Sequence, residues 1–400
     1  MALPPPPAPP PSPAAPPRPL PDLLEEAADA AMAAPSVHNT QPWRIVLHAD
    51  RLDLRADRTR QLTTVDPGGR ELAQSVGAAL FNARVALAAG GWAAQVHRLP
   101  DPEDPDLLAV VHPVASGPDP ALAALAAAVP QRHTDRRRFS GTPVPDDLLR
   151  HLTAEAAQEG TELLPVVREE HRRLLARLTR KADHLQNADA AYRAEIRRWT
   201  TRRRGAGDGV PASAVPHVDD RQRDDRQRDD RQRDDRQRDD RQRGDLPLRD
   251  FDTTGAGALP ADHGSGPDQT LVLLASREDD QHACLRAGEA LERVLLGLTR
   301  LGWAASPVTQ AVEVPRTREQ LRSALTGGAH PQNVLRIGRA VPGPPTPRRR
   351  RDAVVENSTR PPGPPTAPHH AGPTGWPVAG PAAPSGRRPV SDGRGGTTWS

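Results

Sequence analysis

The sequence predicts an α+β fold assembled from two fused copies of one unit. Three observations support this prediction. Short strand-like stretches alternate with longer helix-like ones, and one residue pattern recurs at a fixed offset. Low-complexity segments lie at both ends, outside the part of the chain that can bury a core. Residues 1–19 and 357–400 consist largely of Pro, Ala, Gly, Arg and Ser, so we expect both tails to be disordered.

The recurring pattern is Gly-Ala-Ala-Leu at residues 77–80, ten further residues, and Gly-Trp-Ala-Ala at 91–94. It matches Gly-Glu-Ala-Leu at 288–291, ten residues, and Gly-Trp-Ala-Ala at 302–305, an offset of 211 residues at both ends without a gap. We interpret this as a duplicated unit whose two long helices pack together in the core. The alternative is a coincidence of composition in an Ala-rich chain.

The first half, residues 20–115, is expected to contain helices over 21–33 and from Pro67 to about 89, and strands over 44–48, 52–56 and 107–112. Pro21 lies near the start of the first helix, and acidic residues occupy its first turns. Asp66 is a plausible N-cap for the second helix.

The second half, residues 116–356, is expected to contain helices over 146–157, 169–178, 188–199 and 281–301, and strands over 270–275 and 333–338. The last of these helices has one apolar stripe, formed by Leu291, Val294, Leu295, Leu298 and Leu301.

An insert in this half, residues 219–243, consists of five copies of Asp-Asp-Arg-Gln-Arg. Each copy is neutral, and a five-residue period matches neither a helix nor a strand. We therefore predict a disordered, solvated insert rather than an interaction segment.

The charge balance does not indicate a nucleic-acid partner. The pI is about 9.8, but the formal net charge is only +3, because Lys181 is the only Lys and Tyr192 the only Tyr. Cys284 is the only Cys, which excludes an intramolecular disulfide and fits a reducing compartment. The start of the chain lacks a signal-peptide pattern, and no apolar run reaches membrane-spanning length, so we expect a cytoplasmic protein without membrane contact.

Residues 34–43, Ala-Pro-Ser-Val-His-Asn-Thr-Gln-Pro-Trp, combine a helix stop with amide, hydroxyl and indole side chains. Asn39 and Gln41 each present a donor and an acceptor, so together they can recognise the edge of a flat heterocycle. The alternative is a plain helix end followed by a turn into a strand. Because His38 has no second ligand-type residue at metal-binding spacing, we predict a packing or hydrogen-bonding role for it and no metal site.

Two arginine-rich segments lie in the second half. Residues 132–139, Arg-His-Thr-Asp-Arg-Arg-Arg-Phe, combine guanidinium forks with a hydroxyl, which suits a phosphate. Residues 346–351, Thr-Pro-Arg-Arg-Arg-Arg, follow the last expected strand. The alternatives are a solvated basic face for the first segment and a basic tail with nonspecific nucleic-acid affinity for the second.

With these segments the chain resembles the nitroreductase superfamily of flavoproteins, and within it the Acg-type branch of duplicated, single-chain members. The resemblance covers roughly residues 21–356 and rests on the order and spacing of five motifs, at residues 35–43, 66–72, 132–136, 208–211 and 331–338. It implies a nitroreductase-like fold, with a central antiparallel sheet and a long core helix in each copy.

Ordinary members of this superfamily are homodimers that hold FMN between subunits, one supplying an arginine motif and the other a Pro-Ser loop. Here the first copy keeps the loop and the second keeps the arginine motif, whereas residues 158–164 stand where a second loop would be. The resemblance therefore implies one composite FMN site in a monomer built like the family's dimer.

The arginines and Thr134 are expected at the phosphate and ribityl chain, the loop residues along the flavin ring, and residues 309–310 near flavin N5. The cofactor-binding residues that the resemblance implies are Pro35, Ser36, Asn39, Gln41, Arg132, Thr134, Arg136, Thr309, Gln310, Arg348 and Arg349.

The resemblance implies an FMN-dependent oxidoreductase that transfers hydride from NAD(P)H to a small-molecule electron acceptor such as a nitro compound or quinone. Because flavin N5 carries the chemistry, no catalytic residue is expected from the protein. Residues 208–211 belong to the segment that acts as a lid in Acg-like members, so the alternative is a non-catalytic protein that sequesters FMN. A nucleic-acid or protein-interaction scaffold would explain the arginine runs but not the loop or the internal repeat.

Overall fold

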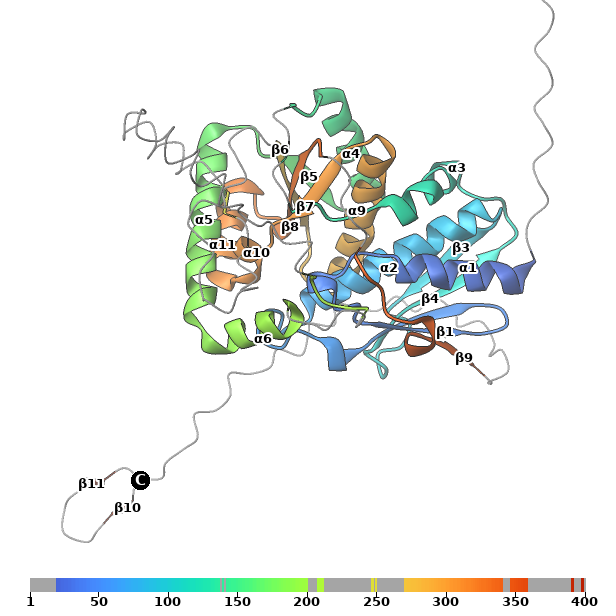
Figure 1. The fold of residues 1–400 in the computed structure, drawn as a ribbon, viewed down its shortest axis with the longest axis horizontal. Coiled ribbons are helices and arrows are strands. Elements are labelled where there is room, and N and C mark those ends of the chain that lie inside the picture. Colours follow the sequence, from blue (N-terminus) through green and yellow to red (C-terminus); the bar gives the residue numbers. More distant parts are fainter. Residues whose placement is uncertain are drawn as a thin grey trace, which may run out of the picture.

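A computed structural model of the protein describes residues 19–136, 139, 142–200, 207–211, 246–247, 249, 270–340, 346–358, 390–391 and 397–398. The predicted insert at 219–243 and most of both predicted tails lie outside the described residues. The described chain forms two halves that lie side by side and meet along two long helices (Figure 1).

The first half comprises α1 (Leu20–Met32), β1 (Trp43–Leu47), β2 (Leu52–Ala56), α2 (Arg70–Ala89), β3 (Ala93–Arg98) and β4 (Leu107–Val114). Its strands are antiparallel and lie in the order β3-β4-β2-β1. Late in the chain, β9 (Val355–Asn357) returns to this half and pairs in parallel with β1, so the C-terminal segment is attached to the first sheet.

The second half comprises α4 (Asp146–Gln158), β5 (Glu162–Pro165), β6 (Thr270–Ser276), α9 (Gln281–Arg300), β7 (Ala304–Pro307) and β8 (His330–Gly338). Two helices, α5 (Glu169–Ala188) and α6 (Ala190–Thr200), lie between β5 and β6 in the chain, and two more, α10 (Gln310–Glu313) and α11 (Pro315–Leu325), lie between β7 and β8. The short α3 (Pro120–Ala123) links the halves, and a separate strand pair is formed by β10 (Val390–Ser391) and β11 (Thr397–Thr398).

The two halves have the same topology. The second sheet is antiparallel in the order β7-β8-β6-β5, which corresponds strand for strand to β3-β4-β2-β1. In each half the long helix, α2 or α9, connects the second strand to the third. The two halves therefore share one α+β strand order with a long helix at the same place, and the duplication itself stays a prediction.

The long helices α2 and α9 cross at one glycine of each. A Cβ atom on Gly77 would lie 2.0 Å from the backbone oxygen of Leu285, and one on Gly288 would lie 2.0 Å from the backbone oxygen of Gln74. These contacts are reciprocal, because both pairs are related by the same offset of 211 residues. Only a residue without a side chain lets two helix backbones approach this closely. The predicted packing of the two long helices within one chain is confirmed.

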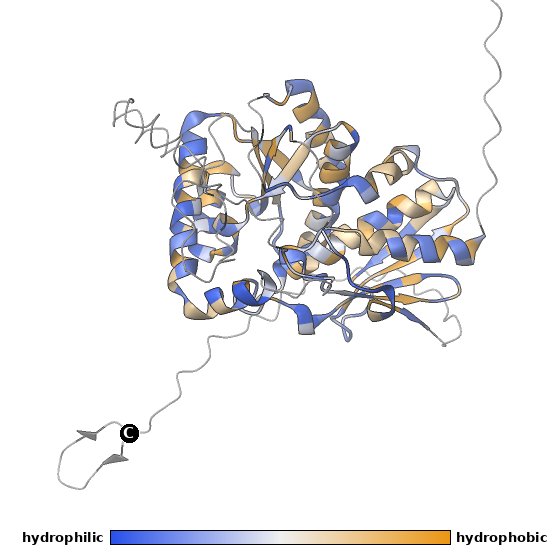
Figure 2. Cartoon of the chain, viewed as in Figure 1, coloured by the Kyte–Doolittle hydropathy of each residue, from blue (hydrophilic) through white to orange (hydrophobic). Residues whose placement is uncertain are grey.

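The sheets are buried to different extents. In β6, Val272 and Leu274 pack with α4 and α9, whereas Leu271 and Leu273 pack on the other face with α5, α10 and α11. The first sheet packs α1 and α2 against one face. Figure 2 shows the matching distribution of hydropathy, with many hydrophilic residues along the outer helix α5. Among the described residues α2 is the one helix long and apolar enough to span a membrane, but most of it is buried between the halves.

Several elements differ from the sequence prediction. The second helix begins at Arg70 rather than at Pro67, because Gly69 adopts a left-handed backbone (φ 73°) and residues 66–69 form a turn. Asp66 still accepts a hydrogen bond from the Leu72 N–H at 2.8 Å. This N–H lies in the first turn, where backbone amides have no partner inside the helix, and Asp66 binds it from outside the helix. Leu301 follows the end of α9 and is 40% exposed, so it does not belong to the buried stripe.

Candidate functional site

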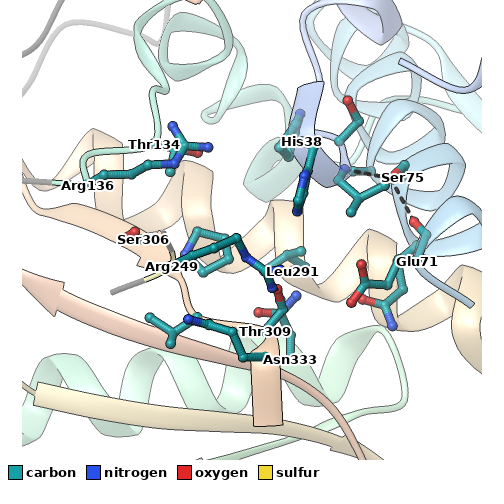
Figure 3. Close-up of a pocket in the computed structure, with 18 residues that line it drawn as sticks. His38, Glu71, Ser75, Thr134, Arg136, Arg249, Leu291, Ser306, Thr309 and Asn333 are labelled. Atoms are coloured by element: carbon teal, nitrogen blue, oxygen red, sulfur yellow. Dashed lines mark hydrogen bonds between the residues drawn. The ribbon is translucent and has the colours of Figure 1, made fainter. Parts of the chain in front are cut away.

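A cavity lies between the two halves, beside the crossing of α2 and α9 (Figure 3). The space inside it amounts to about 900 Å³ when the open mouth is included. Both halves form its walls. The first half contributes residues 35–38 and one face of α2, and the second half contributes Thr134, Arg136, Arg249, Leu291, Asn333 and residues 306–310.

The wall from α2 consists of residues spaced by three and four, Glu71, Gln74, Ser75 and Ala78. Ser75 fixes the neighbouring loop to this helix, because its Oγ accepts a hydrogen bond from the Val37 N–H at 3.1 Å and donates one to the Glu71 carbonyl at 2.7 Å. The loop is therefore held against the helix face that opens onto the cavity.

The loop after α1 has an unusual backbone. His38, Asn39 and Gln41 have φ values of 46°, 55° and 50°, in the left-handed region, which costs roughly 1–2 kcal/mol for a residue with a side chain. The Ser36 Oγ accepts a hydrogen bond from the Gln41 N–H at 2.9 Å and closes the turn. Such strain persists only where neighbouring contacts fix it, and it is typical of binding loops.

An ion pair forms the opposite wall. Arg249 lies 2.5 Å from Glu313 through its Nη2 and donates to the Thr309 hydroxyl at 3.1 Å and to the Tyr192 hydroxyl. Burial by itself would raise the pKa of Glu313, but Arg249 beside it lowers that pKa to about 2. The pair is therefore ionised and holds the start of α10 in place.

Two further titratable groups reach the cavity from opposite sides (Figure 3). Thr134 bridges to Ala305 at the edge strand β7, which places Arg136 on the cavity wall. Burial, and then repulsion by Arg249, lowers the pKa of Arg136 to about 10, so it stays cationic at neutral pH. Burial also lowers the pKa of His38 to about 3, and its imidazole is neutral.

Three polar atoms on the cavity wall have no hydrogen-bond partner within the part of the chain that the structure describes: Glu71 Oε2, Gln310 Nε2 and Asn333 Oδ1. Burial, and then the negative charge of Glu313, raises the pKa of Glu71 well above its usual value. A buried polar atom without a partner costs about 1–3 kcal/mol, so these atoms indicate a ligand with both donors and acceptors. The described residues contain no cluster of three or more His, Cys, Asp or Glu that could hold a metal.

The comparisons with known proteins identify the family of the chain. The chain is 38% identical over 336 residues to the Mycobacterium tuberculosis protein named "Putative NAD(P)H nitroreductase Rv3131". The aligned region covers 82% of this chain and 89% of that protein. The chain belongs to the nitroreductase family, in its Acg-type branch.

A second M. tuberculosis relative, "Putative NAD(P)H nitroreductase acg", is 30% identical over 342 residues, which covers 83% of this chain and 95% of that protein. No family model matches the chain. Among solved structures, a nitroreductase with bound FMN from Bacteroides fragilis aligns with a TM-score of 0.31 at 13% identity, over 56% of this chain and 91% of that one.

Of the cofactor-binding residues implied by the resemblance, the structure brings six to the cavity wall: Pro35, Ser36, Thr134, Arg136, Thr309 and Gln310. They come from three separate segments of this nitroreductase-family chain, one in the first half and two in the second. Their assignment to a cofactor stays a prediction.

Asn39 and Gln41 are buried, but their amide groups bind other segments of the chain. Asn39 Nδ2 donates to the carbonyls of Gly209 at 2.9 Å and Pro347 at 3.1 Å, and Gln41 Nε2 donates to the Gly207 carbonyl at 2.8 Å. These side chains fasten the loop to residues 207–209 and to the C-terminal segment rather than lining the cavity.

Arg348 and Arg349 also lie off the cavity wall. Arg348 binds the last carbonyls of α1, with Nε 3.1 Å from Met32 O and Nη2 2.8 Å from Ala33 O, so it caps that helix. Arg349 Nη1 donates to the carbonyls of Gln41 at 3.1 Å and Trp43 at 3.3 Å. Both arginines hold the C-terminal segment against the loop.

Arg132 lies behind the cavity, next to the same helix end. Its Nε is 3.4 Å from Glu292 Oε1, and its Nη2 is 3.5 Å from the Ala33 carbonyl that Arg348 also binds. Burial and the neighbouring Arg132 lower the pKa of Arg348 to about 9. A buried cation, Arg132, and a partly buried one, Arg348, therefore meet at one carbonyl.

Sequence reasoning missed Glu71, Gln74, Ser75, Asn333 and Arg249. The first three carry a readable signal, because polar residues spaced by three and four interrupt an otherwise apolar helix. Asn333 lies inside an expected strand that is buried along its whole length. Arg249 has no sequence signal, since only the fold brings its segment to α10.

Proposed function

We propose that the chain binds one FMN in the cavity between its halves and catalyses the NAD(P)H-dependent reduction of a small electrophilic acceptor such as a nitro compound or quinone. The observation that carries this proposal is the cavity itself, which needs the loop and α2 of the first half and the 134–136 segment and α10 of the second. The names of the relatives as NAD(P)H nitroreductases support the reaction class.

The chemistry of the cavity wall fits a flavin. Gln310 offers an unused amide donor and Asn333 an unused acceptor, which suits the donor–acceptor edge of a heterocycle. Arg136 supplies a positive charge that suits a phosphate or a reduced, anionic ring. When bound, FMN would accept hydride from NAD(P)H and pass it on.

In this proposal Pro35 and Ser36 border the ring, while Thr134 and Arg136 hold the phosphate and ribityl chain. Arg132 and Arg348 would have to exchange the Ala33 carbonyl for a phosphate in order to contribute. Their closeness supports that role, since two cations side by side, one buried and one partly buried, favour an anion between them.

Flavin binding and reduction test the proposal directly. The purified chain reconstituted with FMN should hold about one FMN per chain, and NADH or NADPH should bleach it without oxygen. Arg136→Ala should weaken FMN binding at least tenfold, whereas Arg277→Ala, at a surface arginine that is 87% exposed, should not. A stoichiometry near two, or no flavin uptake, would contradict the proposal.

One observation favours the alternative, a non-catalytic protein that sequesters FMN. Residues 207–211 are fastened to the loop by Asn39 and Gln41, and Asp208 pairs with Arg60. A segment held this firmly beside the cavity would restrict access. FMN that is bound tightly but is not reduced by NAD(P)H would establish this alternative.

We also propose that the chain acts as a monomer. The apolar faces of α2 and α9 cover each other inside one chain, so neither needs a partner chain to leave water. Light scattering across the nanomolar to micromolar range should give the mass of one chain, and a stable dimer would count against a site completed within one chain.

A further inference from the structure

Glu71 is a buried acid on the cavity wall for which hydride transfer alone provides no role. Its side chain is 5% exposed, its Oε1 lies 3.1 Å from Arg70 Nη2, and its Oε2 has no hydrogen-bond partner among the described residues. As a carboxylate it would leave a buried acceptor unsatisfied. As a carboxylic acid it presents an O–H donor to whatever occupies the cavity.

The charged groups around Glu71 favour the protonated form but can stabilise the carboxylate. Burial and then Glu313 raise its pKa, with a smaller contribution from Asp66 in the same direction. Arg70 and Arg249 oppose this shift. The raised pKa favours the protonated acid, and the guanidinium groups of Arg70 and Arg249 stabilise the carboxylate when the proton leaves.

We propose that Glu71 donates a proton to the electron acceptor bound in the cavity. The inference rests on the proposed function, which supplies the electrons. A quinone takes up two electrons and two protons, and one proton arrives with the hydride that originates from NAD(P)H. The second proton comes from Glu71: its carboxylic O–H bond breaks, and an O–H bond to the quinone oxygen forms. Solvent that enters through the open mouth then returns a proton to the Glu71 carboxylate.

His38 is the other ionisable group on this side of the cavity, and it does not compete for this role. Because its pKa is about 3, the imidazole is not protonated to the imidazolium form near neutral pH and cannot act as the acid. An effective acid has a pKa near the working pH. Burial on the α2 wall of the cavity moves the pKa of Glu71 upward, in the direction that an acid needs.

The first test compares two acceptors on the FMN-loaded chain. Benzoquinone consumes a proton for each electron, whereas ferricyanide accepts electrons without protons. Glu71→Gln should slow benzoquinone reduction about 10²-fold, as loss of a general acid does, and leave ferricyanide reduction and flavin bleaching by NAD(P)H within about twofold. The wild-type quinone rate should fall as the pH rises through the pKa of Glu71, and Glu71→Asp should restore part of this dependence.

The matched control is Glu292→Gln, the same change at a buried glutamate that does not line the cavity, and it should keep the wild-type pH profile. Equal slowing of both acceptors by Glu71→Gln, or no slowing, would overturn the inference. A second readout needs no flavin: the infrared difference spectrum between the wild type and Glu71→Gln should contain a protonated carboxyl band. Glu292, whose pKa is about 7, is present in both proteins and cancels in this difference. If FMN does not bind, the proposed function fails, and an absent band would independently overturn the role of Glu71.

Discussion

The two halves share one scaffold but differ where a ligand would lie. The offset of 211 residues pairs Ala78, on the cavity wall, with Glu289, and it pairs Ser75 with Arg286. Small side chains leave space beside α2, and charged side chains stand at the equivalent positions of α9. The same helix crossing therefore supports an open cavity on one side and a filled position on the other.

Charged groups fill the second position. Glu289 is fully buried and lies 2.5 Å from Arg84 Nη1 and 2.6 Å from Arg98 Nε, and Arg84 also lies 2.8 Å from Glu159. By the same offset, Arg98 corresponds to Thr309 of the cavity. An ion network thus occupies the position that corresponds to the cavity, which supports the proposal of one composite site per chain.

The connection before the first strand of each sheet also differs. Residues 33–42 join α1 to β1, whereas only residues 159–161 join α4 to β5. A ten-residue connection can form the strained loop that borders the cavity, and a three-residue one cannot. The cavity therefore depends on a long loop and on small side chains at two positions of α2 whose counterparts on α9 are charged.

Removing the centre of the ion network should have the largest effect. Glu289→Ala leaves Arg84 and Arg98 largely buried without their shared partner, so we expect the free energy of unfolding to fall by about 3–5 kcal/mol. Chemical denaturation measures this change. Glu25→Ala, which removes a surface partner of Arg351, should stay within about 0.5 kcal/mol, and a similar loss in both variants would refute the special role of the network.

The helix crossing should be the next most sensitive feature. Gly77→Ala places a methyl group against the backbone of α9, and the helices must move apart, so we expect a loss of about 1–3 kcal/mol. Gly297→Ala on α9 is the matched control, since its nearest neighbour would lie at 3.5 Å. Replacing a helical glycine there should be neutral or stabilising by up to about 1 kcal/mol. Equal thermal shifts for the two variants would contradict the backbone contact.

The stability of the chain should depend on pH through Glu292, a buried acid that does not line the cavity. Burial raises the pKa of Glu292 to about 7, although Arg132 opposes the shift. Between pH 4.5 and 7 the unfolded chain releases this proton while the native state keeps it, so this contribution to stability is lost as the pH rises. Glu292→Gln should flatten the dependence of the free energy of unfolding on pH. The difference in this free energy between the variant and the wild type should shift in favour of the variant by roughly 1–3 kcal/mol from pH 4 to pH 8. The exposed control Glu278→Gln should keep the wild-type slope.

Deleting residues 219–243 should have the smallest effect. The segment contains no apolar residue, and shortening a long connection changes its closure entropy only slowly. We expect the melting temperature and the FMN content to stay unchanged within error. A lower melting temperature with loss of flavin would show that the insert contributes to the second half.

The sequence determined the local elements and the central symmetry. Alternation predicts the hairpin of β1 and β2. Asp66 and Pro67 predict the start of α2, an apolar stripe predicts α9, and the repeated pattern predicts that these helices pack together. Each signal is local or periodic, so it can be read without knowing distant neighbours. The short strands β3, β5, β7 and β9 carry no such signal, because pairing to an existing sheet is what makes them strands.

Only the tertiary structure decided which polar residues line the cavity. Asn39 and Gln41 carry the chemistry of a ligand-binding loop, yet residues 207–209 and the C-terminal segment compete for the same amide groups and bind them. Glu71 and Arg249 reach the cavity because helix α2 and a segment 178 positions further along the chain meet at one place. Residue type determines what a side chain can bind, and long-range packing determines which partner it meets.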